Sequence, residues 1–153
     1  MPETETDSDL YTMTWEEAAE AVATSDLAVL PTGSIEQHST HLPTSTDTLR
    51  ADYLSAELVE AAPDHGLELL RLPTLPFGYS EHHMRFPGTI TLSRETYVDA
   101  VVEIGESMAA HGVDRLLFLN THGGNKEPLA MAADRLGRET ALTVHFVHWT
   151  DFA

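Results

Sequence analysis

The chain has 153 residues, of which 42% are hydrophobic, and it contains no cysteine. This length suffices for one α/β domain with a buried core, and the absence of cysteine excludes thiolate metal sites. The 25 acidic residues outnumber the 8 basic residues, for a formal net charge of −17. That charge excludes nucleic acids and anionic membranes as partners, because a phosphate-binding surface is basic. The acidic residues are dispersed along the chain, which favours adaptation to high salt.

The two ends of the chain differ in character. Residues 1–10 predict an acidic, solvated arm, and residues 11–153 predict a single domain. The N-terminus lacks the charged-then-apolar pattern of a signal peptide, and no apolar run reaches the length of a membrane span. We therefore expect a cytoplasmic protein without a membrane partner.

Helix and strand patterns alternate from Thr14 onward. A capping box at Thr14–Glu17 predicts a helix to about residue 23, and further helices are predicted over 47–62, 93–111 and 127–138. Strands are predicted over 27–31, 67–72, 115–120 and 142–149, with a brief strand at 89–92 after a long loop over 73–88. This alternation predicts a parallel sheet with helices on both faces.

Potential metal ligands follow two of these strands. Glu36 and His38 are two residues apart, so they project to the same side of an extended segment, and Asp47 comes shortly afterwards. His122 lies in the loop over 120–125, after another strand. Because open α/β sheets bind ligands at the carboxyl ends of their strands, the fold can bring these four residues together. Mixed carboxylates and imidazoles suit zinc, manganese or iron(II).

Simpler interpretations stand beside these. The first cluster can be an exposed polar loop, and the loop over 120–125 can be a glycine-rich turn or a phosphate cradle before a helix. The loop lacks the Lys-Ser/Thr ending of a P-loop.

The segment over 79–83, with its two adjacent histidines, is expected to contact substrate or to support the ligands rather than to bind metal. His65 and His111 lie near helix ends and are interpreted as structural, and His145 and His148 are predicted on opposite faces of a strand.

Three ordered motifs together resemble the creatininase (creatinine amidohydrolase) family over nearly the whole chain. They are GSIEQH with HLP and Asp47, then Ser80 and His83 before FPGT, and finally NTHGGN. The resemblance implies a three-layer α/β/α sandwich with a mostly parallel sheet, two divalent metal ions, and a homo-oligomer such as a hexamer.

The resemblance also implies roles for the four metal-binding candidates. Glu36 and His122 would hold one metal, His38 would hold the other, and Asp47 would bridge the two. The ions would be zinc, manganese or iron(II).

Three further positions bear on the substrate. Ser80 matches a position that contacts substrate, and Gly123 stands where creatininase proper has an aromatic residue. Gly124 replaces a glutamate that binds the second metal there. These two glycines argue against creatinine itself as the substrate. Family members also continue beyond the equivalent of Ala153, so the chain is expected to lack the family's C-terminal segment.

The leading hypothesis is a metal-dependent amidohydrolase that cleaves a non-peptide C–N bond, in a small cyclic amide or formamide, with metal-activated water. No general acid is assigned. A formylamino-pyrimidine deformylase of flavin biosynthesis and peptide-trimming relatives are alternatives within this class. From other classes, the alternatives are a catalytically incomplete metal-binding domain and a phosphate- or nucleotide-binding domain that uses the loop over 120–125.

Overall fold

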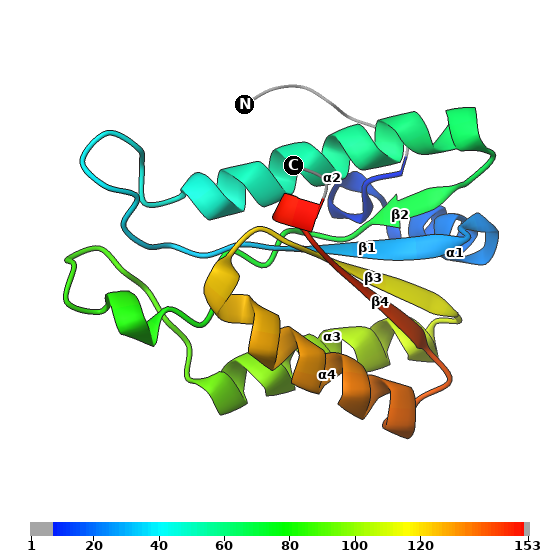
Figure 1. The fold of residues 1–153 in the computed structure, drawn as a ribbon. Coiled ribbons are helices and arrows are strands. Elements are labelled where there is room, and N and C mark those ends of the chain that lie inside the picture. Colours follow the sequence, from blue (N-terminus) through cyan, green and yellow to red (C-terminus); the bar gives the residue numbers. More distant parts are fainter. Residues whose placement is uncertain (1–7, 152–153) are drawn as a thin grey trace.

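The centre of the fold is a sheet of four parallel strands, shown in Figure 1 for the computed structural model, which describes residues 8–151. The strand order is β2-β1-β3-β4, so β1 and β3 are central and β2 and β4 are the edges. The strands are β1 (Leu27–Thr32), β2 (Leu69–Arg71), β3 (Arg115–Asn120) and β4 (Thr143–His148). In this register Thr32 lies opposite Asn120, and Asn120 lies opposite His148. The last residues of three strands therefore meet at one end of the sheet.

Helices cover both faces of the sheet. Helix α2 lies on one face, and α3 and α4 lie on the other (Figure 1). The α-helices are α1 (Trp15–Thr24), α2 (Thr46–Ala61), α3 (Arg94–Ala110) and α4 (Lys126–Glu139). Short 3-10 helices are η1 (Leu10–Thr12), η2 (Ala62–His65), η3 (Glu81–His83), η4 (Gly123–Asn125) and η5 (Trp149–Asp151). The predicted α/β fold, with helices on both faces of a parallel sheet, is confirmed.

Side chains of the central strands alternate between the two faces of the sheet, and this produces two hydrophobic clusters, one on each face. Leu30 and Phe118 belong to a large buried cluster with residues of α3 and α4, whereas Val29 and Leu119 belong to a smaller cluster with residues of α2. Successive side chains of a strand point to opposite faces, so a strand that is apolar on both faces suits a sheet covered on both sides. The apolar runs in β1 and β3 therefore place these strands at the centre.

Most predicted elements are confirmed with shifts of a few residues. The capping box at Thr14 and Glu17 opens α1, and Gly112 follows α3 with a φ of 100°, in the left-handed region that favours glycine. The brief strand predicted over 89–92 is wrong. Within it, only Ile90 makes a sheet contact, an isolated antiparallel bridge to Ile35. Thr91 instead accepts a hydrogen bond from the Ser80 amide through its hydroxyl, which holds this segment as a loop.

The start of the folded domain lies earlier than the predicted arm suggests. Residues 1–7 of that arm lie outside the described residues. Asp9 is buried, and its carboxylate lies 2.7 Å from the guanidinium of Arg71 in β2. Arg71 also pairs with Asp52 of α2 and donates to the Ser55 hydroxyl. Asp9 therefore belongs to the folded domain, because a buried arginine needs charged and polar partners.

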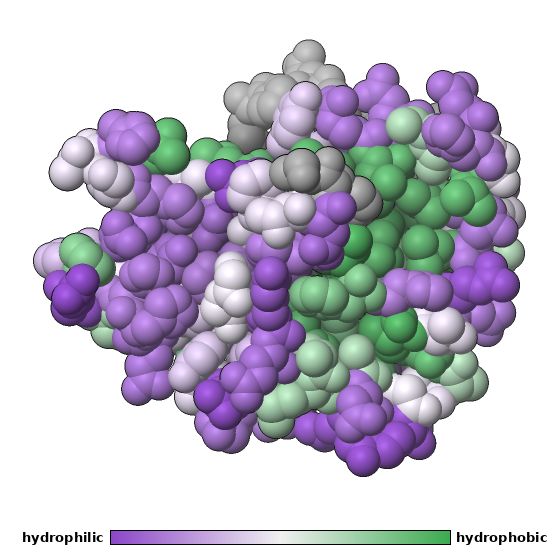
Figure 2. All heavy atoms as spheres, in the orientation of Figure 1, coloured by the Kyte–Doolittle hydropathy of each residue, from purple (hydrophilic) through white to green (hydrophobic). Residues whose placement is uncertain are grey.

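The surface is divided between an apolar and a hydrophilic region. Figure 2 shows hydrophobic residues gathered beside β4, between α2 and α4, and hydrophilic residues at the end where the loops after β1 and β3 lie. Phe146 of β4 and Met131 of α4 are among the exposed large hydrophobic residues. Within residues 8–151, none of the helices has the length and apolar character needed to cross a membrane.

Candidate metal centre

The candidate site lies at the carboxyl ends of the two central strands. Glu36 and His38 follow β1, and His122 follows β3 at the second residue after Asn120. Because β1 and β3 are paired and parallel, their following loops leave the same end of the sheet. Asp47 lies in the first turn of α2, at the helix end where the dipole favours a carboxylate.

Asp47 lies between two imidazoles. One carboxylate oxygen, Oδ1, is 3.1 Å from His38 Nε2, and the other, Oδ2, is 3.1 Å from His122 Nδ1. The carboxylate is buried, as is the imidazole of His122. Arg50 approaches the same Oδ1 at 3.4 Å and stacks over the ring of Trp149. A carboxylate that faces one imidazole with each oxygen has the arrangement required of a bridging ligand.

Glu36 contributes a second buried carboxylate. Its Oε1 lies 3.2 Å from His122 Nδ1. His83 Nε2 lies 3.1 Å from Oε2, yet within residues 8–151 this buried oxygen has no hydrogen-bond partner. A buried acceptor without a donor costs free energy, about 1–3 kcal/mol, unless a cation or water compensates it.

Two backbone carbonyls set the orientation of the imidazoles. The Tyr79 carbonyl lies 3.0 Å from His122 Nε2, and the Glu36 carbonyl lies 3.3 Å from His38 Nδ1. A carbonyl only accepts, so each of these ring nitrogens carries the hydrogen. The opposite nitrogens, His122 Nδ1 and His38 Nε2, therefore face the carboxylates. Metal-binding histidines in proteins are commonly held in this way by a carbonyl on the far nitrogen.

In the metal-free site, a proton on His122 supplies the positive charge beside the carboxylates. Burial alone would lower the pKa of His122, but hydrogen bonds to Asp47 and Glu36 outweigh that effect and raise the pKa to about 9. Burial would likewise raise the pKa of Asp47, yet the hydrogen bond and charge of His122, with those of His38, hold it below its ordinary value. The site thus favours an ionised carboxylate and a cation beside it.

Buried amides and hydroxyls hold the loops in place. Asn125 accepts from the Tyr79 amide at 2.9 Å and donates to the Gly33 carbonyl at 3.0 Å. The Thr121 hydroxyl lies 2.7 Å from the Asp47 carbonyl, which ties the start of α2 to the end of β3. Asn120 donates to the carbonyl of His122 at 2.7 Å. These hydrogen bonds hold the carboxyl ends of β1 and β3 and the start of α2 together.

The same contacts argue against a phosphate cradle in the loop over 120–125. Four backbone N–H groups here already donate to acceptors within the protein: those of Thr121, His122, Asn125 and Lys126. A phosphate cradle needs several free N–H groups directed at the ligand.

The two predicted substrate-binding residues differ in exposure. Ser80 is fully buried, and its hydroxyl lies 2.5 Å from the Ser34 hydroxyl and 3.0 Å from His122 Nε2. Gly123 is exposed, and a Cβ at this position would have no neighbour within 4 Å. In this structure, Ser80 supports His122, whereas Gly123 leaves open space beside the candidate ligands.

Two residues of η3 reach the site although no metal-binding role was predicted for them. His83 lies against Glu36, and the ligand atoms of His82, Glu36 and His122 all lie within 4.8 Å of one another. A second group of this kind comprises Glu36, His38 and Asp47. The sequence signals for these residues are the adjacency of two histidines in a long loop between regular elements and, for His83, its place in the motif before FPGT.

The remaining histidines lie apart from these groups. His65 is in the last turn of η2, and His111 caps the C-terminus of α3, as interpreted from the sequence. His145 is exposed, whereas His148 is buried and lies 3.1 Å from the Asn120 amide nitrogen through Nδ1. The two residues are three apart within β4, and successive strand residues point to opposite faces, so they lie on opposite faces as predicted.

The fold and this cluster define a candidate metal-binding α/β domain. The chain belongs to the creatininase family, described as creatinine amidohydrolase, whose sequence profile matches residues 11–153.

Curated relatives include a mycofactocin precursor peptide peptidase from Mycobacterium tuberculosis, which is 39% identical over 122 residues, or 76% of this chain and 48% of the relative. The creatinine amidohydrolase of Pseudomonas putida is 30% identical over 133 residues, or 83% of this chain and 49% of the relative. The chain thus spans about half the length of these relatives.

Solved structures agree on the fold. A creatinine amidohydrolase (creatininase) structure superposes with a TM-score of 0.83 at 29% identity, over 95% of this chain and 59% of that one. A structure described as "Creatininase Mn" gives 0.82 at 27% identity, over 96% and 60%. A creatininase variant described as "Zn-Zn type" gives 0.84 at 26% identity, over 96% and 60%.

Proposed function

We propose that the chain holds two divalent metal ions through Glu36, His38, Asp47 and His122, and that it uses them to hydrolyse an amide C–N bond. The observation that carries the proposal is the convergence of three electron-pair donors. Asp47 Oδ2 and Glu36 Oε1 lie 3.1 and 3.2 Å from His122 Nδ1. When the ring is neutral, its hydrogen is on Nε2, which faces the Tyr79 carbonyl, so Nδ1 presents an electron pair. Three such atoms repel one another unless a cation lies among them.

The residues present fit a metal. Two carboxylates and two imidazoles are a common donor set for zinc, manganese or iron(II). The buried Glu36 Oε2 without a hydrogen-bond donor supports the same conclusion, since a metal would compensate it. Family members solved with manganese or zinc make these two ions the first candidates.

The division of ligands follows from the two oxygens of Asp47. His122 Nδ1 lies 3.1 Å from Oδ2 and 3.2 Å from Glu36 Oε1, so Glu36 and His122 would hold one ion beside Oδ2. His38 Nε2 lies 3.1 Å from Oδ1 and would help to hold the other. Asp47 would then bridge both. This assignment agrees with the roles that the resemblance implies.

The bound ions would supply Lewis acidity, which activates water and polarises a substrate carbonyl. The chain's own residues prepare the site. The Tyr79 and Glu36 carbonyls hold the imidazoles in the required tautomers. The two carboxylates balance the charge of the ions, and the open space at Gly123 admits a substrate beside His122.

We propose a small cyclic amide or a formamide as the substrate. A peptide bond is the second candidate, because the 39% identical relative is a peptide peptidase, whereas the creatinine amidohydrolase is 30% identical. The glycines at 123 and 124 still argue against creatinine itself.

The test compares wild-type protein with Asp47→Asn and uses Asp134→Asn as a matched control. Among residues 8–151, Asp134 pairs only with Arg138, on the exposed face of α4. After removal of metal with a chelator, each protein is reloaded with zinc or manganese, and bound ions are counted by mass spectrometry. Assays then use creatinine, a cyclic imide, an N-formyl amine and a short peptide.

We expect two ions in wild type and in the control, fewer in Asp47→Asn, and hydrolysis of an amide substrate only with metal. Bound metal without hydrolysis of any substrate would favour the catalytically incomplete metal-binding domain. A wild-type protein that binds no ion would contradict the proposal.

The predicted homo-oligomer and the cytoplasmic location are part of this proposal. The hexamer is the reference form for the oligomer, and analytical ultracentrifugation of the metal-loaded protein tests it. A monomer under these conditions would contradict the oligomer.

A further inference from the structure

We propose that His82 is a ligand of the metal ion that Glu36 and His122 hold. This inference rests on the proposed function, because it requires a metal at those two residues. It adds a donor from η3, in the long loop between β2 and α3, to the ligands from the loops after β1 and β3.

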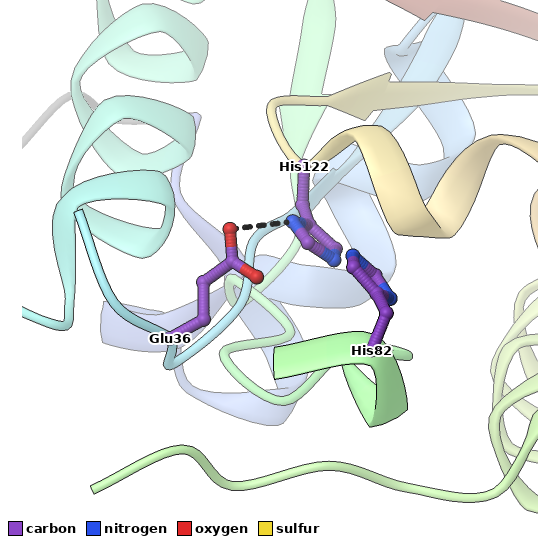
Figure 3. A group of neighbouring side chains, drawn as sticks. All are labelled: Glu36, His82 and His122. Atoms are coloured by element: carbon purple, nitrogen blue, oxygen red, sulfur yellow. Dashed lines mark ion pairs between the residues drawn. The ribbon is translucent and has the colours of Figure 1, made fainter. Parts of the chain in front are cut away.

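The three side chains come from separate segments and converge. Figure 3 shows the imidazole of His82 directed at that of His122, with the Glu36 carboxylate on the other side of His122. One ligand atom of each residue lies within 4.8 Å of the other two. His82 is exposed, so its side chain can rotate to close the set on one ion.

The ring of His82 is available for a metal. Its ring lies near the rings of Tyr79, His83 and His122, and within residues 8–151 neither of its nitrogens makes a hydrogen bond. It lies parallel to the ring of His122, with centroids 5.9 Å apart and an interplanar angle of 8°. An imidazole aimed into a site with a free nitrogen is a ready ligand for a divalent ion.

Gly124 makes the space that His82 occupies. A Cβ at position 124 would lie 2.8 Å from His82 Cε1 and 2.5 Å from His122 Nε2, and only 2.4 Å from the Tyr79 carbonyl oxygen. A side chain at 124 and the present position of His82 therefore exclude each other. The resemblance implies a metal-binding glutamate at position 124, and the glycine present there leaves room for the His82 imidazole instead.

Hydrogen bonds fix the segment that carries His82. The amide of Tyr79 donates to the Asn125 side chain at 2.9 Å, and the amide of Ser80 donates to the Thr91 hydroxyl at 2.8 Å. The Ser80 hydroxyl lies within 3.0 Å of His122 Nε2. The backbone just before His82 is thus tied to the same support as the metal ligands.

The absence of cysteine from the chain allows a direct test with Co²⁺. In His82→Cys, a cysteine thiolate at position 82 can give a sulfur-to-cobalt charge-transfer band only if it coordinates the ion. His65→Cys is the matched control, since His65 is exposed beyond the C-terminal end of α2, which is about 21 Å of helix away from Asp47. His82→Ala, with His65→Ala as its control, gives the change in affinity for Co²⁺ and Zn²⁺.

We expect the charge-transfer band in His82→Cys and not in His65→Cys. Binding of both ions should weaken at least about tenfold in His82→Ala but not in His65→Ala. An absent band in His82→Cys, with cobalt bound at the wild-type ratio, would overturn the inference. That holds even if His82→Ala weakens binding, because this pattern marks a residue that only positions the ligands. Failure of the wild-type chain to bind cobalt and zinc would instead overturn the proposed function and this inference together.

Discussion

Asp47 Oδ2 lies 3.1 Å from His122 Nδ1, although 75 residues separate the two in the chain. Parallel pairing of β1 and β3 brings their loops to one end of the sheet, and the Thr121 hydroxyl ties the start of α2 to the same point. The contact therefore depends on the fold as a whole. It also joins the two halves of the proposed metal centre, because the other oxygen of Asp47 faces His38.

The raised pKa of His122 predicts that metal binding strengthens with pH. Below about pH 9 the ring of His122 is protonated in the metal-free protein, so an ion must displace a proton. We expect the apparent affinity for zinc to rise about tenfold per pH unit between about pH 7 and about pH 9, with release of about one proton. Isothermal titration calorimetry in buffers of different ionisation enthalpy measures both. An affinity that is flat over this range would contradict the protonated state of His122.

The free energy of unfolding of the metal-free protein should depend on pH through the titration of both Asp47 and His122. The folded pKa of His122, about 9, is above its ordinary value of 6.5, so its contribution is complete below about pH 6.5 and is lost as the pH rises through 9. The pKa of Asp47 is below its ordinary value of 3.8, so its contribution is lost as the pH falls through the folded pKa. We expect greatest resistance to urea between about pH 4 and about pH 6.5.

The variant Asp47→Asn isolates the effect of the Asp47 charge on the pKa of His122. Asp47→Asn removes the charge that raises the pKa of His122, so that pKa should fall in a titration followed by NMR. The pH dependence of stability above about pH 6.5 should weaken with it. An unchanged His122 titration in Asp47→Asn would show that Asp47 is not its main partner.

Asn125 should contribute to stability through its amide. The side chain is fully buried, accepts from the Tyr79 amide and donates to the Gly33 carbonyl. Asn125→Ala leaves both partners unsatisfied, and we expect a loss of about 2–4 kcal/mol in the free energy of unfolding, measured with urea. Thr24→Ala removes an exposed hydroxyl at the end of α1 and should cost less than about 0.5 kcal/mol. Equal losses in the two variants would argue against a supporting role for Asn125.

The net charge predicts a response to salt. A formal charge of −17 on 153 residues destabilises the compact state through self-repulsion, which salt screens. We propose adaptation to high salt, and expect the melting temperature to rise steadily from about 0.1 M to about 2 M KCl. A melting temperature that falls over this range would contradict the proposal.

The sequence predicts the fold well because its signals are local. Apolar runs mark β1 and β3, and caps and glycines mark the helix ends. The rule that ligands gather at the carboxyl ends of parallel strands then places Glu36 and His122 together from sequence order alone.

The contribution of η3 escapes such signals. The position of His82 depends on contacts over long distances in sequence, such as the hydrogen bond from the Tyr79 amide to Asn125 and the space left by Gly124. The burial of Ser80 likewise results from its contacts with Ser34 and His122. No local periodicity encodes these contacts, so the structure is needed to find them.

Crystals of the chain soaked with zinc, with anomalous scattering measured at the zinc edge, test the central claim most directly. The account predicts two anomalous peaks on either side of the Asp47 carboxylate, one within bonding distance of Glu36 and His122 and the other within bonding distance of His38. Full zinc occupancy elsewhere with no peak at Asp47 would contradict it.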